Sequence, residues 1–205
     1  WIPSVTRRCW KMLGLREKLR GKCGMTEFWR GRRVLVTGHT GFKGSWLSLW
    51  LHMKGAYVSG LALPPQSEDD LSSLLQVEEF VASTLVDICA PEACSHAIEA
   101  AKPDVVFHLA AQALVRPSYE DPVTTWSTNV MGTLHLLQSL SKIGRPCVVV
   151  VVTTDKVYEN REWPYSYRET DRLGGHDPYS ASKAAVETLV ASQRHSFLSA
   201  RGIRV

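Results

Sequence analysis

The sequence predicts an α/β fold of the Rossmann type, in which a doubly wound parallel sheet carries helices on both faces. Two observations indicate this fold. From residue 33 onward, short apolar runs typical of buried strands alternate with longer segments of helical character. The first apolar run leads directly into a glycine-rich turn, GHTGFKG at 38–44, with glycine at every third position. Strands that are apolar on both faces are typical of a parallel sheet covered by helices.

Each strand and helix is predicted from its own residues. The strands are short apolar runs such as RVLVT, and the second of them is stopped by Pro64 and Pro65. Asp121 and Pro122 are typical of an N-cap and a first helical position, and Gly144 is typical of a helix end. The expected strands are 33–37, 56–63, 83–88, 104–110 and 147–154, with a sixth beginning at 202. The expected helices are 41–54, 91–102, 121–143 and 178–200, with one short helix within 64–76.

The first 24 residues differ from the rest of the chain in charge. They carry seven Lys and Arg residues and one Glu, a net charge of +6, whereas the whole chain carries +4. Such a basic segment is typical of an arm that binds nucleic acid or a membrane surface. We favour a disordered or non-native extension, because Met25 stands like an ordinary start just before the first strand. Residues 25–205 are then expected to form one Rossmann domain, incomplete at its C-terminal end, with neither nucleic acid nor membrane as partner.

Composition argues against a membrane-spanning, disulfide-bonded or zinc-binding protein. No apolar run is long enough to span a bilayer, and 44% of the residues are hydrophobic, as in an ordinary globular domain. The five cysteines are odd in number and form no CxxC pair, and no His and Cys cluster has the spacing of zinc ligands. We therefore expect reduced thiols, a cytoplasmic protein and no metal site.

The glycine-rich turn is suited to a dinucleotide because it follows a strand and opens a helix. Gly38 permits the tight turn, Gly41 lets the backbone approach a pyrophosphate, and Gly44 lets the helix pack closely on the sheet. Phosphates would then face the N–H groups of the helix start. The spacing is GxxGxxG rather than GxGxxG, and a strand–helix turn without a ligand is the alternative. Trp46 and Trp50 follow at helical spacing and are expected to pack in the core.

A second motif, YSASK at 179–183, places a phenol and an ammonium on one face of a helix. The ammonium of Lys183 favours the phenolate form of Tyr179. Such a tyrosine can take a proton from a hydroxyl while hydride leaves the same carbon. Thr154, at the end of the fifth strand, offers a hydroxyl to share that proton. The alternative is a tyrosine and a lysine that merely lie on the surface of a helix.

Together these residues resemble the extended short-chain dehydrogenase/reductase family over residues 33–205. The segments GHTGFKGSWLSLWL, HLAAQALVRPSY, STNVMGT, TTDKVYEN and GGHDPYSASK are most similar to the sugar-nucleotide 4,6-dehydratases that act on CDP-glucose. The resemblance implies NAD as cofactor, CDP-glucose or a related sugar nucleotide as substrate, and a C-terminal substrate domain that this chain lacks. It also implies a homodimer through helices 121–143 and 178–200, although both helices would also be explained by covering the sheet.

The resemblance assigns further roles. Asp87 would contact the adenine, and Asn129 is similar to a structural asparagine of the family. Asp155 and Lys156 stand where many relatives carry an Asp-Glu acid–base pair. Asp155 would protonate the departing 6-hydroxyl of the sugar. Lys156, in its neutral form, would remove the C5 proton. A capping carboxylate and a solvated lysine are the alternatives. The expected catalytic residues are Thr154, Asp155, Lys156, Tyr179 and Lys183. The expected cofactor-binding residues are Gly38, Thr40, Gly41, Phe42, Lys43, Gly44, Asp87, Ile88, Ala110, Ala111, Gln112, Asn129, Tyr179 and Lys183.

The sequence departs from the family pattern at the end of the second strand. An acidic residue that grips the ribose 2′-hydroxyl is expected there, but the position is Ala62. Lys43, inside the glycine-rich turn, would tolerate a 2′-phosphate, so NADP stays open beside NAD. His39 and His108 are expected to be turn and core residues rather than catalytic ones.

Two other functions remain open. A sugar-nucleotide epimerase would use the same Tyr179 and Lys183 but would need no elimination pair. A truncated, non-catalytic NAD-binding fragment would keep the glycine-rich turn without turnover, since relatives continue well beyond residue 205.

Overall fold

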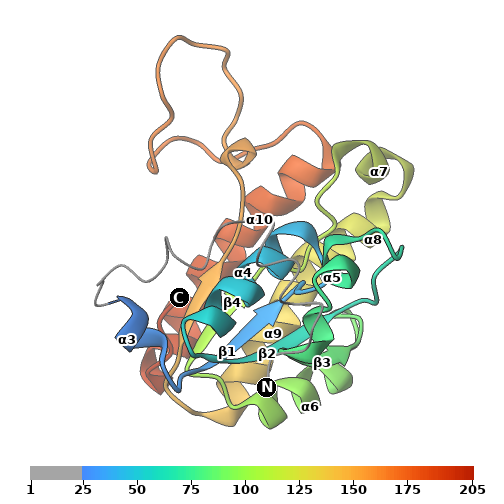
Figure 1. Cartoon of the computed structure of the whole chain (residues 1–205). Coiled ribbons are helices and arrows are strands. Elements are labelled where there is room, and N and C mark those ends of the chain that lie inside the picture. The colour runs from blue at the N-terminus through green and yellow to red at the C-terminus, as the bar shows by residue number, and fades with distance from the viewer. Residues whose placement is uncertain (1–24) are drawn as a thin grey trace.

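A parallel sheet lies at the centre of the fold, as predicted, and it has five strands (Figure 1). The computed structural model describes residues 25–205, so the segment 1–24 and the expectation of a disordered extension lie outside the described residues. The strands are β1 (Arg33–Thr37), β2 (Tyr57–Ala62), β3 (Ala82–Leu85), β4 (Val105–His108) and β5 (Val148–Val151). They are ordered β3-β2-β1-β4-β5, and every neighbouring pair is parallel. The winding reverses between β1 and β4, which is where such sheets bind ligands.

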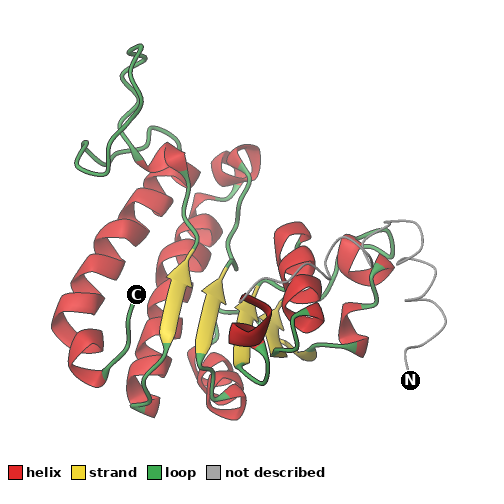
Figure 2. Cartoon of the chain, turned by 60° about the vertical axis from the view of Figure 1, so that its left-hand side comes forward, coloured by secondary structure: helices red, strands yellow, loops and turns green. Residues whose placement is uncertain are grey.

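Helices cover both faces of the sheet, which is therefore doubly wound (Figures 1 and 2). The α-helices in the described residues are α3 (Met25–Trp29), α4 (Phe42–Met53), α5 (Leu71–Leu74), α6 (Pro91–Ala101), α7 (Val115–Glu120), α8 (Pro122–Trp126), α9 (Gly132–Ile143) and α10 (Pro178–Gln193). Val34 and Val36 of β1 belong to the core beneath α4, where Trp46 and Trp50 also pack, as predicted. Leu35, between them, belongs to the core beneath α6 and α9. Within residues 25–205, no helix is both long and apolar enough to cross a bilayer.

The two longest predicted helices are interrupted. Asp121 caps α8 as predicted, its side chain accepting from the Thr124 N–H at 2.9 Å. A π-helical turn, η2 (Ser127–Met131), then separates α8 from α9. The predicted helix 178–200 ends at Gln193 and continues as the π-helical turn η4 (Arg194–Leu198) and the 3₁₀ turn η5 (Ser199–Arg201). A π-helical turn adds only one residue to a helix. The spacing of apolar residues changes too little for the sequence to reveal such a turn.

The strands are shorter than predicted at the edge where they end. The predicted strands 83–88, 104–110 and 147–154 leave the sheet after Leu85, His108 and Val151, and the residues beyond form loops at that edge. The expected sixth strand is reduced to one parallel bridge between Val148 and Arg204. The short helix expected within 64–76 is α5, whereas α7 was not predicted. Two short 3₁₀ turns also bear on the description below: η1 (Val77–Glu79) and η3 (Asp155–Val157).

The strands β3 and β5 are less buried than expected, because the sequence predicted strands that are covered on both faces. All four residues of β3 are exposed, because it is an edge strand with β2 as its neighbour. In β5, Val149 is buried against the core beneath α9, whereas Val148 and Val150 on the opposite face are exposed. The apolar composition of β5 therefore reflects one buried face and one open face.

A long arm, residues 158–173, separates β5 from α10 and projects away from the body of the domain (Figures 1 and 2). Its base is closed by an antiparallel bridge between Tyr158 and Leu173. The rings of Tyr158 and Tyr167 stack with their centroids 5.5 Å apart, and Trp163 lies against Tyr167 at 5.6 Å. The arm is thus held by its own aromatic side chains.

The glycine-rich turn packs against itself as the spacing predicts. A Cβ at Gly44 would lie 2.0 Å from the Gly38 carbonyl oxygen and 2.8 Å from the His39 Cα. Such distances are far inside van der Waals contact, and both neighbours are backbone atoms that cannot rotate away. Gly44 is therefore required for the start of α4 to lie on β1.

We expect Gly44→Ala to lower the free energy of unfolding by about 3 kcal/mol or more, because the backbone must shift to admit the methyl group. Urea unfolding of the 205-residue chain measures this loss. Gly41→Ala is the matched control in the same turn: its Cβ would lie 3.3 Å from the Gly38 carbonyl oxygen, so a much smaller loss is expected. Equal stability of the Gly44→Ala and wild-type chains would contradict this packing.

Candidate active site

The loops that follow β1, β4 and β5 meet at the carboxyl edge of the sheet. Thr37, the last residue of β1, joins the first two loops, because its hydroxyl accepts from the N–H groups of Leu109 and Ala110 at 3.2 and 3.1 Å. The third loop is joined to them through α10, as described below. All but two of the predicted site residues come from these loops, the start of α4, the π-helical turn and the first two turns of α10; the exceptions, Asp87 and Ile88, follow β3.

The glycine-rich turn leaves the start of α4 uncovered. Gly38 has a φ of +74°, and a Cβ there would lie 2.9 Å from the Ala110 nitrogen. Gly41 is the N-cap of α4, and no side chain caps this helix start. The N–H groups of the first turn therefore have no partner from within the helix. Phe42 and Lys43 are exposed beside them. This arrangement fits a diphosphate, which needs backbone N–H groups and no intervening side chain.

Three predicted cofactor residues lie around the ends of β2 and β3. The Thr40 hydroxyl donates to the Leu63 carbonyl at 2.9 Å and ties the glycine-rich turn to the end of β2. Asp87 is exposed, and its carboxylate accepts from the Cys89 N–H at 2.8 Å. The side chain of Ile88 is buried in the core, where a Cβ on Gly132 would come within 2.6 Å of it. Ile88 therefore presents backbone, not side chain, to this edge.

Asn129 binds two segments of the site with its single amide. Its Oδ1 accepts from the Gln112 N–H at 2.9 Å, and its Nδ2 donates to the Gln112 carbonyl at 3.1 Å. The same Nδ2 donates to the Ser182 hydroxyl at 2.8 Å, and this hydroxyl donates to the Tyr179 carbonyl at 2.7 Å. Asn129 is 1% exposed and lies in the π-helical turn η2. It therefore holds the loop after β4 to the helix that carries Tyr179.

His108 continues this buried network toward β1. The Thr133 hydroxyl donates to the Asn129 carbonyl at 2.6 Å, so it accepts from the Nε2–H of His108 at 2.9 Å. The Thr37 hydroxyl, already accepting two N–H groups, donates to Nδ1 of His108 at 2.7 Å. Burial lowers the pKa of His108 to about 3, and the nearby charge of Lys183 also lowers it. The imidazole is therefore neutral, which agrees with the prediction of a core residue. His39, also predicted to be non-catalytic, is likewise buried.

Tyr179 and Lys183 lie one turn apart on the buried face of α10. The Lys183 ammonium donates to the carbonyl of Val152, the first residue beyond β5, at 3.2 Å. Burial lowers the pKa of Lys183 to about 8, although the carboxylate of Glu187 acts to raise it. Lys183 is only 7% exposed. A lysine with this pKa changes its charge within the range in which enzymes work, which makes it a functional candidate.

Thr154, Asp155 and Lys156 form a turn that packs against α10. The Thr154 hydroxyl donates to the Asp155 carboxylate at 3.0 Å and accepts from the Lys156 N–H at 3.3 Å. Asp177, the N-cap of α10, accepts from the Ser180 N–H at 2.9 Å. Partial burial acts to raise the pKa of Asp177, but the Ser180 hydrogen bonds and the charge of Lys156 hold it below its usual range. The turn thus lies near the end of α10 that bears Tyr179.

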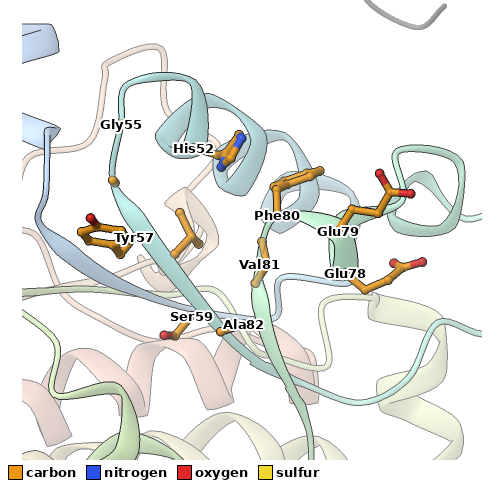
Figure 3. A pocket seen from close by; sticks show the side chains of 11 residues that line it. His52, Gly55, Tyr57, Ser59, Glu78, Glu79, Phe80, Val81 and Ala82 are labelled. Carbon is orange, nitrogen blue, oxygen red and sulfur yellow. The ribbon is translucent and has the colours of Figure 1, made fainter. Parts of the chain in front are cut away.

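A separate hollow of about 640 Å³ lies at the opposite edge of the sheet (Figure 3). It is lined by the end of α4, the starts of β2 and β3, and the 3₁₀ turn η1. The His52 and Phe80 rings face each other there, with centroids 5.1 Å apart. Because it lies at the amino ends of these strands, this hollow is not part of the candidate active site.

Sequence reasoning missed several residues that support the site. Ser182 lies inside the YSASK motif, one residue before Lys183, and its position there was a usable signal. Thr133 and Thr37 carry no such signal, because a threonine in an apolar element resembles any strand or helix residue. Glu187 and Thr153 were also missed, and they meet only in the folded chain.

Comparisons with known proteins agree with this geometry. The family model described as GDP-mannose 4,6 dehydratase matches residues 35–200. The chain belongs to this family. The matched range includes the glycine-rich turn, Asn129 and the YSASK motif.

Individual relatives include both dehydratases and epimerases. The CDP-glucose 4,6-dehydratase of Salmonella typhimurium is 50% identical over 171 residues, which cover 83% of this chain and 48% of that protein. The UDP-glucose 4-epimerase of Mycolicibacterium smegmatis is 34% identical over 175 residues, covering 80% of this chain and 52% of that protein. The chain thus spans about half the length of the curated relatives it matches.

Solved structures of the family's relatives have the same fold. The UDP-glucose 4-epimerase of Thermus thermophilus in complex with NAD is 32% identical and superposes with a TM-score of 0.68, covering 80% of this chain and 51% of that one. The UDP-glucose 4-epimerase of Thermotoga maritima with UDP-glucose is 26% identical, with a TM-score of 0.71, covering 80% and 52%. The Rossmann-type prediction is therefore confirmed.

We expect Asn129→Ala to lower the free energy of unfolding by about 3 kcal/mol, because it leaves the half-buried backbone groups of Gln112 and the buried hydroxyl of Ser182 without a partner. Urea unfolding of the 205-residue chain gives this value. Asn160→Ala, in the exposed arm, is the control and should change stability by less than about 1 kcal/mol. If both substitutions cost the same, the amide of Asn129 does not hold the two segments together.

The buried charge of Lys183 predicts a pH dependence of stability. Its pKa is about 8 in the folded chain and 10.5 when unfolded. Between these values the unfolded chain binds a proton that the folded chain has released, so stability rises with pH. We expect the wild type to gain roughly 3 kcal/mol over this range relative to Lys183→Met. Denaturant unfolding from pH 7 to 10.5 measures this difference, and Lys142→Met, which removes an exposed lysine of α9, should behave as the wild type.

Proposed function

We propose that this chain carries the cofactor-binding and proton-transfer residues of an NAD-dependent sugar-nucleotide 4,6-dehydratase, acting on CDP-glucose to form the 4-keto-6-deoxy sugar nucleotide. The observation that carries this proposal is that the turn beginning at Thr154 packs against α10, the helix that bears Tyr179 and Lys183, at the edge of the sheet to which the glycine-rich turn also belongs. The 50% identity to a CDP-glucose 4,6-dehydratase supports the reaction and the substrate.

The glycine-rich turn would hold the cofactor's diphosphate through the backbone N–H groups at the start of α4. Asp87 would contact the adenine, the loop 110–112 would line the cofactor, and Lys183 would hold the nicotinamide ribose. Bound in this way, NAD would supply a temporary hydride acceptor for the sugar. The complexes of two epimerase relatives with NAD support NAD rather than NADP.

Tyr179 would begin the reaction by removing the proton of the sugar 4-hydroxyl. Lys183 lies one turn away on the buried face of the same helix. Thr154 would share the proton through its hydroxyl. Burial of Tyr179 and Lys183 removes competing water, so the charge of the lysine acts on the tyrosine more strongly than it would at an exposed surface.

Asp155 and Lys156 would carry out the elimination. The 4-ketone acidifies the C5 proton, which Lys156 in its neutral form would remove, while Asp155 would protonate the departing 6-hydroxyl. The Thr154 hydroxyl donates to Asp155 at 3.0 Å, so the groups assigned to oxidation and elimination are in contact. This contact supports a single site for both steps.

An epimerase is the second candidate function. Relatives such as the UDP-glucose 4-epimerase of M. smegmatis support it, and epimerisation needs Tyr179 and Lys183 without an elimination pair. A non-catalytic NAD-binding fragment is the third; it would keep the glycine-rich turn without turnover.

We also propose a homodimer that forms through α8, α9 and α10. Val123, Trp126 and Met131 are exposed apolar side chains on α8 and the adjoining π-helical turn, and α8 packs beside α10. Such a row of exposed apolar residues favours an interface between copies. The cytoplasmic location remains a prediction.

Two substitutions in the full-length protein separate these functions. Incubation with CDP-glucose and NAD, with detection of the 4-keto product, is the assay. Tyr179→Phe should abolish product, because the proton acceptor is lost; full activity of this variant would refute the mechanism.

Asp155→Asn should reduce dehydration by at least about 100-fold and would spare an epimerase. An unchanged rate of dehydration in Asp155→Asn would exclude the proposed acid.

A further inference from the structure

The buried positive charge of Lys183 has few contacts that stabilise it. Its ammonium carries three N–H groups, and the one hydrogen bond described for it is to the Val152 carbonyl at 3.2 Å. It is 7% exposed, so water reaches it poorly. Burial of an ammonium is costly unless an opposite charge lies near, and without one the group loses its proton.

Glu187 lies one helical turn beyond Lys183 and is held in place from the strand. Its carboxylate accepts from the Thr153 hydroxyl at 2.5 Å. Lys183 and Glu187 thus contact successive residues, Val152 and Thr153, at the end of β5. Side chains four residues apart lie on the same face of a helix, and the Thr153 contact directs Glu187 toward the strand end rather than toward solvent.

We propose that Glu187, anchored by Thr153, is a positioning residue that keeps Lys183 in its charged form at the end of β5. The inference rests on the proposed function for its catalytic consequence, but the charge of Lys183 can be measured without turnover. Glu187 is half-buried, which places its charge where solvent screens it incompletely.

Other charged groups around α10 do not replace Glu187. His108 on β4 is close enough to sense the charge of Lys183, but it is neutral and supplies no negative charge. The described effect of a charge on Lys183 comes from Glu187, which raises its pKa against the effect of burial. α8 and the π-helical turn η2 carry no titratable side chain. The remaining titratable groups on elements packed against α10 are Arg116, Tyr119 and Glu120 of α7, His135 and Lys142 of α9, Asp155 and Lys156 of η3, and Arg194 and His195 of η4.

The test is an NMR titration of the 205-residue chain labelled in its lysine side chains. The Lys183 signal is assigned by its absence in Lys183→Arg. We expect Glu187→Gln to lower the pKa of Lys183 by about one unit, because a half-buried counter-charge has been removed. Glu99→Gln, at an exposed position of α6, changes net charge equally and should leave the titration unchanged.

A second pair of variants guards against a fold defect. Thr153→Val keeps the carboxylate but removes its anchor, so a shift in the same direction and smaller is expected, and Thr153→Ser should restore the wild-type titration. An unchanged Lys183 titration in folded Glu187→Gln or, should that variant not fold, in Thr153→Val would overturn the inference.

Activity of the full-length protein separates this inference from the proposed function. In Glu187→Gln, the Lys183 titration and the alkaline limb of the kcat/KM profile should move to lower pH by the same amount. In that case both the role of Glu187 and the proposed function stand. If the titration shifts while the alkaline limb does not move, Glu187 still sets the charge of Lys183, and the role assigned to Lys183 in the reaction fails.

Discussion

The amide of Asn129 is the interaction on which the candidate active site depends. A Rossmann sheet brings the ends of its strands to one edge, but it does not by itself place a helix side chain over that edge. Asn129 does so by pairing with both backbone groups of Gln112 and reaching Ser182 on α10 with the same nitrogen. Because Asn129 and Ser182 are buried and Gln112 is half-buried, each lost partner would carry a desolvation cost, and the arrangement is correspondingly rigid.

The π-helical turn around Asn129 explains how this contact is made. An uninterrupted helix from 122 to 143 would present residue 129 at a different angle to the loop after β4. The extra residue of the turn rotates the side chain into place, at the expense of regular helix hydrogen bonding. The network then continues through Thr133 and the neutral His108 to Thr37 at the end of β1. A single line of buried hydrogen bonds therefore connects the strand that carries the glycine-rich turn to the helix that carries Tyr179 and Lys183.

Charge is distributed in the site according to burial. His108 lies deepest and is neutral, Lys183 is buried with a pKa of about 8, and Asp155 and Lys156 are exposed at the rim. The neutral imidazole adds no second buried positive charge beside Lys183, and the negative charge of Glu187 raises the pKa of Lys183. The site thus combines a rigid neutral interior with charged groups at its exposed rim.

The amino-acid sequence by itself determined the fold class, the succession of strands and helices along the chain and the two motifs of the site, because apolar periodicity and glycine spacing are local properties. Gly38, Gly44, Asp121 and Tyr179 stand in the conformations and elements that these patterns predict. Only the tertiary structure decided where the long helices break, which face of β5 is open, and that Asn129 meets Ser182 and Glu187 meets Thr153. These contacts join residues tens of positions apart through buried polar atoms, and no pattern within one helix or strand encodes such a pairing.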